Sequence, residues 1–490
     1  MRFWVVSPNV KNDKNMMAWL KAISKNHCVY MGYEPTAKGA GRCFNNKVSN
    51  NDVILVARCA NKNKELYFAG IVDSAVKKVT PQKDGVPEIA YARKLKGMVG
   101  KDVLAALKLD FAGSAYLEAD RIPAIYELHP ERNPKDREIV SKLRATLEKA
   151  MSMNEQNVQI GRWIALLKSN YNLILTGAPG TGKTYLARQI AQKLIFGENW
   201  TLKKESEFNP EEKNEFDQRF EFVQFHPSYD YTDFVEGLRP KRPDGSGNIG
   251  FERKDGTFKK FCEEARKECK YKDKDNREYD EASKKFVFVI DEINRGEISK
   301  IFGELFFAID PGYRGVAGKV LTQYANMQDG SDDEKKKFYV PENVYIIGTM
   351  NDIDRSVESF DFAMRRRFVW EEIKAWETKE DKTNIVSMLD ELDQIKDGLT
   401  KDAVNHLVKL NQAIWNDEGD GGKGTGIDGL SSSFHIGGAY FRKLKNYNGD
   451  FRDLWKYHLE PLLREYLRGM PEEKDNLGKL KAAYESANNG

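Results

Sequence analysis

The sequence predicts an α/β protein in which a small β domain precedes a parallel sheet and a helical region follows it. Three observations predict this order: short strand-like apolar runs up to about residue 130, alternating buried strands and helices over 155–376, and helical periodicity over 377–490. With 490 residues, the chain is long enough for about three domains. A single small binding module is therefore excluded.

The composition indicates a soluble globular protein, with 40% hydrophobic and 31% charged residues. No apolar run approaches the ~20 residues of a transmembrane helix, and the first residues lack the apolar core of a secretory signal. The five cysteines form no CxxC pair, as expected of reduced thiols. We expect a cytoplasmic protein with no membrane partner.

The net charge of +3 is unevenly distributed along the chain. Residues 1–130 contain 20 lysines and arginines against 12 aspartates and glutamates, a net of +8, which leaves −5 for the rest. A basic first domain favours contact with a polyanion. Lysines that only solvate a small β domain would give the same charge, so both interpretations stay open.

Residues 1–130 are predicted to form a small β-barrel or sheet, from the apolar runs 3–6, 53–56 and 66–72. A linker helix is predicted over 131–154, where apolar residues recur at helical spacing. These residues are Ile139, Leu143, Leu147 and Met151.

The segment 155–376 contains four buried strand runs separated by helices, which implies a parallel sheet covered on both faces. The runs are 173–176, 222–225, 286–290 and 344–348. Residues 377–490 follow as a helical domain, and its glycine-rich stretch 419–429 is interpreted as a flexible connection because no strand precedes it.

A phosphate-binding loop is the strongest motif, since residues 177–184 fit G-x-x-x-x-G-K-[ST] in full between a buried strand and a helix. Its backbone N–H groups and the helix N-terminus would hold phosphates, Lys183 would reach the β- and γ-phosphates, and Thr184 would ligate Mg²⁺. The predicted nucleotide-binding residues are Gly177, Ala178, Pro179, Gly180, Thr181, Gly182, Lys183, Thr184 and Asp291.

Two further buried strands end in polar side chains at the edge where the phosphates would lie. Asp291 would hold Mg²⁺, and Glu292 would act as general base on the attacking water. Asn351 would orient that water. Three arginines are consecutive at Arg365, Arg366 and Arg367, and bringing three positive charges together costs free energy unless anions lie nearby. One or more of these arginines is therefore predicted to reach the nucleotide of a neighbouring subunit. The alternative is a basic turn exposed to solvent.

These motifs together resemble the AAA+ family and, more narrowly, the McrB-type GTPase subunits of modification-dependent restriction systems. The resemblance covers roughly 155–470 and rests on the segments 225–229, 237–240, 291–295, 350–356, 365–368, 436–441 and 461–466. This sequence departs from the family pattern at Asp352-Ile353, where the family usually has Thr-Ala. The choice between GTP and ATP as the substrate therefore stays open. No arginine in the lid, residues 377–490, matches the usual second sensor.

The resemblance implies GTP (or ATP) hydrolysis with Mg²⁺ in a homo-oligomeric ring, expected to be a hexamer, that activates a separate McrC-type nuclease. Asp244 followed by Glu252 and Lys254 superficially fits a nuclease metal site. The neighbouring glycines indicate a surface hairpin instead, so we expect no nuclease site in this chain.

The N-terminal region is more weakly similar to the EVE branch of the PUA-like β-barrels, which implies a reader of modified DNA that takes an extruded base into an aromatic pocket. The resemblance rests on the segments 3–8, 48–55 and 69–73, with Asn51 where glycine is common. The candidate walls of that pocket are Trp4, Trp19, Tyr30 and Tyr33. An ordinary aromatic core explains each of them equally well.

Two other classes of function compete with a restriction motor. The first is an ATP-dependent remodelling chaperone whose N-terminal domain binds protein. The second is a nucleic-acid binder whose nucleotide site only switches assembly, although intact Asp291, Glu292 and Asn351 argue against it.

Overall fold

A computed structural model describes residues 2–6, 13–31, 44, 47–60, 63–80, 90–109, 125–241, 250–273, 278–328, 333–353, 362–376, 385, 388–417 and 424–489. The chain divides into two compact units, 1–155 and 156–490. Within the described residues, no helix is both long and apolar enough to cross a membrane.

The first unit contains a seven-stranded mixed sheet in the order β2-β6-β4-β3-β1-β7, with β5 added beside β6. β1 and β3 are parallel, and the other pairs are antiparallel. The predicted strands are confirmed, whereas closure into a barrel stays a prediction. The elements are β1 (Phe3–Val6), α1 (Asp13–Asn26), β2 (Cys28–Met31), β3 (Val53–Ala60), β4 (Asn63–Val72), β5 (Lys77–Val79), β6 (Ala90–Gly100), α4 (Lys101–Ala106) and β7 (Ile125–Leu128).

Both faces of this sheet are buried, because successive side chains of a strand point to opposite faces. Phe3 and Val5 pack toward α4 and the following long helix, whereas Trp4 and Val6 pack toward α1. The backbone just before β3 is left-handed at Asn51, with φ 68°. Glycine and asparagine adopt this conformation at low cost, which explains why either residue fits there.

The helix α5 (Pro134–Asn170) is longer than the predicted linker over 131–154. Its early apolar residues, such as Leu143 and Leu147, belong to the core of the first unit. Its later residues, such as Trp163 and Leu167, belong to a core of the second unit. The predicted linker is therefore the first part of a continuous helix that contributes to both cores.

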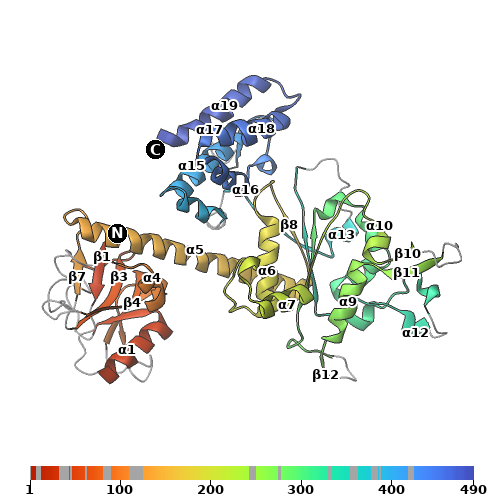
Figure 1. The fold of residues 1–490 in the computed structure, drawn as a ribbon, viewed down its shortest axis with the longest axis horizontal. Coiled ribbons are helices and arrows are strands. Elements are labelled where there is room, and N and C mark those ends of the chain that lie inside the picture. The colour runs from red at the N-terminus through yellow and green to blue at the C-terminus, as the bar shows by residue number, and fades with distance from the viewer. Residues whose placement is uncertain are drawn as a thin grey trace. The chain divides into compact units, whose positions relative to one another are not determined.

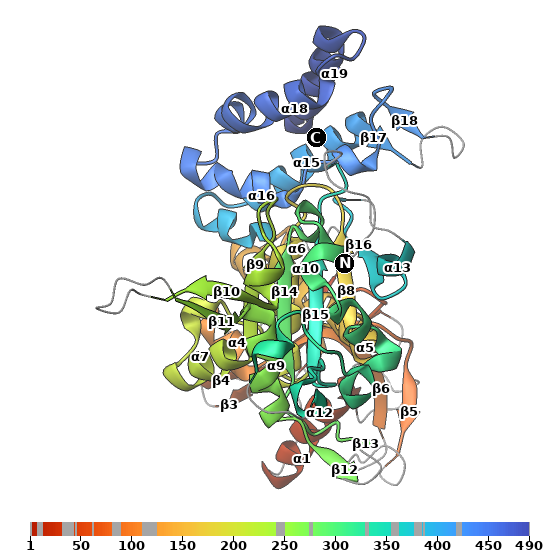
Figure 2. The same cartoon turned by 90° about the vertical axis from the view of Figure 1, so that its right-hand side faces the viewer.

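The second unit is built on a parallel five-stranded sheet in the order β16-β8-β15-β14-β9 (Figures 1 and 2). This confirms the predicted parallel sheet and each of its four predicted strands. The strands are β8 (Asn172–Thr176), β9 (Phe220–Gln224), β14 (Phe286–Asp291), β15 (Val344–Thr349) and β16 (Val369–Glu372).

Helices cover both faces of the sheet, as Figure 1 shows. Alternate residues of β14 divide between two cores: Val287 and Val289 face α5, α6 and α7, while Phe286, Phe288 and Ile290 face α8 to α11. These helices are α6 (Lys183–Phe196), α7 (Pro210–Arg219), α8 (Tyr231–Phe234), α9 (Thr257–Lys267), α10 (Ile298–Phe302) and α11 (Leu305–Ala308).

Smaller elements extend from this layer. The hairpin of β10 (Glu236–Pro240) and β11 (Phe251–Asp255) lies between α8 and α9 and is anchored by Glu236, which is fully buried and bonds Lys259 and Arg253. The remaining elements are β12 (Tyr271–Asp273), β13 (Glu278–Tyr279), α12 (Asp333–Lys336) and α13 (Phe362–Arg365).

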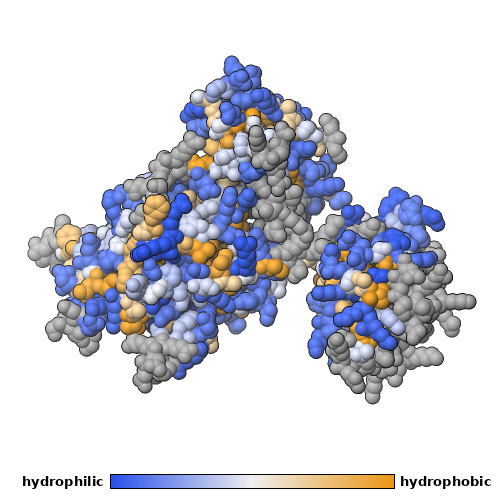
Figure 3. Space-filling model, turned by 180° about the vertical axis from the view of Figure 1, so that it is seen from behind, coloured by the Kyte–Doolittle hydropathy of each residue, from blue (hydrophilic) through white to orange (hydrophobic). Residues whose placement is uncertain are grey.

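The predicted helical lid is also confirmed, with its own apolar core. Its elements are α15 (Leu399–Ile414), β17 (Trp415–Asn416), β18 (Thr425–Gly426), α16 (Gly438–Phe441), α17 (Phe451–Leu454), α18 (Glu460–Leu467) and α19 (Glu473–Glu485). The surface seen in Figure 3 is mainly hydrophilic, with hydrophobic residues in small separate groups. This agrees with the high proportion of charged residues.

Candidate active site

The phosphate-binding loop connects β8 to α6 and depends on glycine backbone geometry. Gly177, Gly180 and Gly182 have φ values of 135°, 79° and 90°, a region that residues with a Cβ rarely adopt. At Gly177, a Cβ would also overlap the backbone oxygen of Ile373. The loop therefore has the tight turn that the motif predicts, and Gly182 caps the N-terminus of α6.

Lys183 is buried, and its Nζ donates to the backbone oxygens of Gly177, at 2.9 Å, and Ala178, at 2.8 Å. The ammonium is thus held on carbonyls of its own loop. A bound phosphate would offer the same ammonium a full negative charge, which makes a shorter and stronger hydrogen bond than a carbonyl does.

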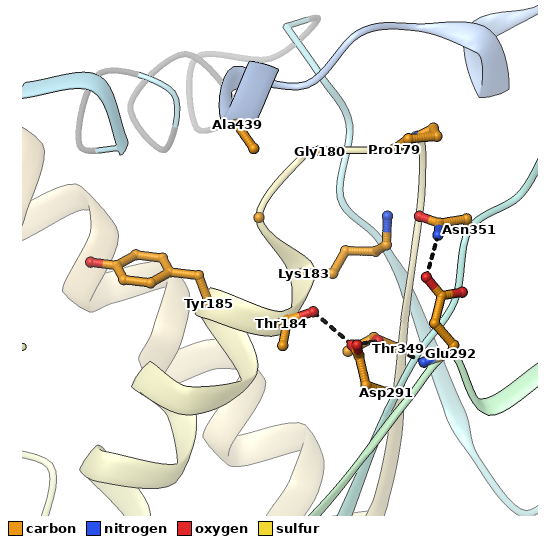
Figure 4. A pocket seen from close by; sticks show the side chains of 11 residues that line it. Pro179, Gly180, Lys183, Thr184, Tyr185, Asp291, Glu292, Thr349, Asn351 and Ala439 are labelled. Carbon is orange, nitrogen blue, oxygen red and sulfur yellow. Dashed lines mark hydrogen bonds between the residues drawn. The ribbon is translucent and has the colours of Figure 1, made fainter. Parts of the chain in front are cut away.

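The loop opens on a pocket of about 300 Å³ (Figure 4). The pocket brings together five of the eight predicted loop residues, both predicted carboxylates and the predicted amide, which come from segments far apart in the sequence, whereas Gly177, Ala178 and Thr181 do not line it. It is lined by Pro179, Gly180, Gly182, Lys183, Thr184, Tyr185, Asp291, Glu292, Thr349, Asn351 and Ala439.

One side of the pocket is a cluster of oxygen atoms around Asp291. Its Oδ1 accepts hydrogen bonds from the hydroxyls of Thr184, at 2.7 Å, and Thr349, at 2.6 Å. Oxygen ligands suit Mg²⁺, which is usually held by one or two protein groups together with waters and phosphate oxygens. Thr184 and Asp291 are two such protein groups, so this cluster fits Mg²⁺ bound together with a nucleotide.

The other side of the pocket carries Glu292, the predicted general base. Asn351 Nδ2 donates to its Oε1 at 2.8 Å, and Arg295 Nε lies 3.3 Å from its Oε2. Glu292 has a left-handed backbone, with φ 50° and ψ 45°, directly after β14. Such a conformation is uncommon outside glycine and asparagine and is concentrated at functional sites.

The structure adds pocket residues that the sequence analysis did not select. Thr349 and Ala439 line the pocket, and neither has a residue type that signals chemistry by itself. Asp352 lies at the same end of β15 and donates its backbone N–H to Gly177 at 3.3 Å. Burial raises the pKa of its carboxyl, an effect that the positive charge of Lys183 partly offsets.

The three predicted arginines have different environments. Arg365 and Arg366 are exposed, and the Arg365 guanidinium lies 5.2 Å from the Trp370 ring centroid. Arg367 is buried, donates to Ala363 and lies 3.6 Å from the carboxylate of Asp310.

The prediction that an arginine of this run reaches a neighbouring subunit's nucleotide is therefore wrong for Arg367, because its side chain is enclosed by its own subunit. Its backbone oxygen also accepts a hydrogen bond from Asn172, at 2.8 Å, which ties this turn to the start of β8. Only Arg365 and Arg366 are left facing outward, next to Phe362, whose side chain is 90% exposed.

Of the candidate DNA-binding aromatics that the structure describes, Trp4 and Trp19 belong to two buried clusters, and Tyr30 packs against both. Trp4 lies in the core, and its Nε1 donates to buried Asp52 at 3.0 Å. Trp19 is also buried and packs against Tyr30, with ring centroids 5.1 Å apart. Tyr33 lies outside the described residues. Trp4 and Trp19 thus have the environment that the core interpretation predicted.

Comparison with known proteins gives two family matches within the second unit. Residues 172–368 match the AAA domain of the dynein-related subfamily, and residues 402–475 match the alpha-helical lid domain of McrB. The chain carries an AAA domain followed by a helical lid that is similar to the lid domain of McrB.

Two curated relatives are similar to part of the chain. The Type IV methyl-directed restriction enzyme EcoKMcrB subunit of Escherichia coli (strain K12) is 35% identical over 271 residues, which are 55% of this chain and 47% of the relative. The Type II restriction enzyme BsuMI component YdiS of Bacillus subtilis (strain 168) is 26% identical over 239 residues, which are 46% of this chain and 64% of the relative. This chain therefore aligns with about half of the first relative and less than two thirds of the second.

Replacing Lys183 by alanine is expected to weaken nucleotide binding at least about 100-fold, because a buried charge that would contact the phosphates is removed. Equilibrium titration with a fluorescent nucleotide measures the loss. Lys193→Ala is the matched control, because Lys193 lies in the same helix but donates to the Glu198 backbone oxygen. Equal affinity of wild type and Lys183→Ala would contradict the role of Lys183.

Proposed function

We propose that this chain is the nucleotide-hydrolysing DNA-recognition and motor subunit of a modification-dependent restriction system, with GTP as the preferred nucleotide. One observation carries the proposal: a single pocket holds Lys183, the Thr184–Asp291 pair and the Glu292–Asn351 pair in a McrB-type module. Both curated relatives are components of restriction enzymes by name.

In the proposed reaction, Asn351 orients the attacking water and Glu292 accepts its proton, while the water oxygen bonds to the γ-phosphorus and the bond from that phosphorus to the β–γ bridging oxygen breaks. Lys183 binds the phosphates as a point charge. Thr184 and Asp291 would hold Mg²⁺, which when bound neutralises negative charge on the phosphate oxygens. The 2.8 Å contact between Asn351 Nδ2 and Glu292 Oε1 supports their joint role, because it holds the two side chains together at the wall of the pocket.

We infer that the protein works as a homo-oligomeric ring, with six subunits as the expected number. Arg365 and Arg366 are exposed, so their side chains are free of the enclosure that holds Arg367 and could contact a neighbouring subunit. An arginine supplied by a neighbouring subunit can stabilise the charge that develops on the transferred phosphoryl group.

The proposed partner is a McrC-type nuclease on a separate chain. Of the residues that superficially fit a nuclease site, Asp244 lies outside the described residues. Glu252 and Lys254 lie on β11 and form an ion pair with each other at 3.1 Å, so they resemble a surface hairpin pair more than a metal site.

A reconstitution experiment tests this proposal. The full chain would be combined with a PD-(D/E)xK protein encoded by a neighbouring reading frame, together with modified or unmodified DNA and GTP, ATP or neither. We expect cleavage only with modified DNA and GTP. Turnover that prefers ATP and ignores DNA would instead favour an ATP-dependent remodelling chaperone.

The N-terminal unit is proposed to read modified DNA, and we expect the full chain to bind a modified duplex more tightly than the same unmodified duplex. Tyr33→Ala should remove this preference, since stacking of an extruded base contributes roughly 1–3 kcal/mol. Fluorescence anisotropy with methylated and hydroxymethylated cytosine and methylated adenine duplexes measures the preference.

Lys77 and Lys78 serve to separate phosphate contacts from recognition of the modified base, because both are exposed on β5. Changing both to glutamate should weaken binding to every duplex alike and reduce the salt dependence, as expected for phosphate contacts. A folded chain that binds no duplex of this panel at low salt would contradict the reader role and favour a protein ligand.

A further inference from the structure

The lid contacts the phosphate-binding loop through its backbone. Gly437 N donates to the Pro179 backbone oxygen at 3.0 Å, and Ala439 N donates to the Gly180 backbone oxygen at 3.0 Å. Two consecutive carbonyls of the loop are therefore bonded to the segment that begins α16. In Figure 4, Ala439 lies next to the loop at Gly180.

Gly437 is glycine because of this contact and not because of its own conformation. Its φ of −81° and ψ of 163° are open to any residue. A Cβ at this position, however, would overlap the carbonyl of Gly180 and the amide nitrogen of Thr181. A side chain at 437 is thus compatible with the fold of the lid but not with its approach to the loop.

The arginines of the lid do not take part in this contact. All four are described, and each is ion-paired with a carboxylate of the lid: Arg442 with Glu391, Arg452 with Asp450, Arg464 with Glu460 and Arg468 with Glu465. Among the described pocket-lining residues, the lid contributes only Ala439.

We propose that Gly437 is a positioning residue, through which the lid docks on the phosphate-binding loop by backbone hydrogen bonds instead of through an arginine. We call residues 437–439 the backbone clamp. The clamp also couples the lid to nucleotide occupancy, and that second part rests on the proposed function.

The coupling follows from the order of acceptors along the loop. Lys183 bonds the carbonyls of Gly177 and Ala178, while the clamp bonds those of Pro179 and Gly180, which come next. Phosphates that draw Lys183 away from its two carbonyls would change the loop conformation. The lid, held by the adjacent carbonyls, would respond to that change.

Gly437→Ala tests the clamp, with Gly478→Ala as the matched control, because a Cβ at Gly478 in α19 would meet no atom within 4 Å. Hydrogen–deuterium exchange without nucleotide is the first measurement. We expect Gly437→Ala to lose protection in the peptide that contains 437–441 and to keep protection in α15 and α19. Unchanged exchange of that peptide would overturn the docking role.

Steady-state kinetics with GTP and ATP are the second measurement. Losing two hydrogen bonds should raise KM roughly tenfold, while kcat stays within about threefold because the hydrolytic residues are intact. A merely destabilised variant would show the opposite, with kcat lowered at unchanged KM, and that result would overturn the coupling.

Ala439→Pro is a second variant, which removes one donor of the clamp at a first-turn position that tolerates proline. We expect it to raise KM by a smaller factor than Gly437→Ala does, and an unchanged KM in both variants would refute the coupling. A wild-type chain without nucleotide turnover would contradict the proposed function, whereas the exchange experiment would still decide the docking role.

Discussion

Glu292→Gln is expected to bind GTP with nearly unchanged affinity and to hydrolyse it about 10³-fold more slowly. Glutamine keeps the size of the side chain and an oxygen for Asn351 Nδ2, but an amide cannot accept the proton of the attacking water. Equilibrium titration and single-turnover phosphate release measure binding and chemistry separately.

Glu297→Gln is the matched control for this prediction. Glu297 follows Glu292 by five residues, is partly exposed and pairs with Lys300 outside the pocket. Its replacement should leave both measurements unchanged. Near-wild-type hydrolysis by Glu292→Gln would show that another group is the base.

The double variant Arg365→Ala/Arg366→Ala is expected to lose about 10³-fold or more in turnover while still binding nucleotide, because charge supplied across an interface acts mainly in the transition state. Mixing it with Glu292→Gln should restore hydrolysis. At equal random mixing, about a quarter of the interfaces would join an intact Glu292 to intact arginines.

Arg367→Ala separates this effect from structural damage. It leaves the carboxylate of Asp310 without its buried partner, so we expect a loss of about 3 kcal/mol in the free energy of unfolding. Thermal melting measures that loss. Rings shown by mass spectrometry to be mixed but without recovered hydrolysis would contradict action of Arg365 or Arg366 in trans.

The parts of the fold that the sequence predicted are those with local signals. Each buried strand of the second unit is a run of apolar residues ending in a polar group, and the phosphate-binding loop combines a fixed spacing with a strand before it and a helix after it. Because carboxyl ends of parallel strands meet at one edge, the sequence alone places Asp291, Glu292 and Asn351 in one site, and all three line the same pocket.

The features that the sequence did not predict depend on contacts between residues far apart in the sequence. Nothing in three consecutive arginines distinguishes Arg367, whose environment is set by Asp310, 57 positions earlier. Trp4 resembles a binding aromatic until Asp52 is seen beside it. Gly437 has an ordinary backbone, so only the approach of the phosphate-binding loop explains it.

We expect this pocket to hydrolyse GTP in preference to ATP. The most direct test is phosphate release by the full chain with Mg²⁺ and either nucleotide at a series of concentrations, with Lys183→Ala as the blank. The account predicts repeated turnover with kcat/KM at least about tenfold higher for GTP, and a higher rate when modified DNA is added. Turnover of neither nucleotide above the blank, or of ATP alone, would contradict it.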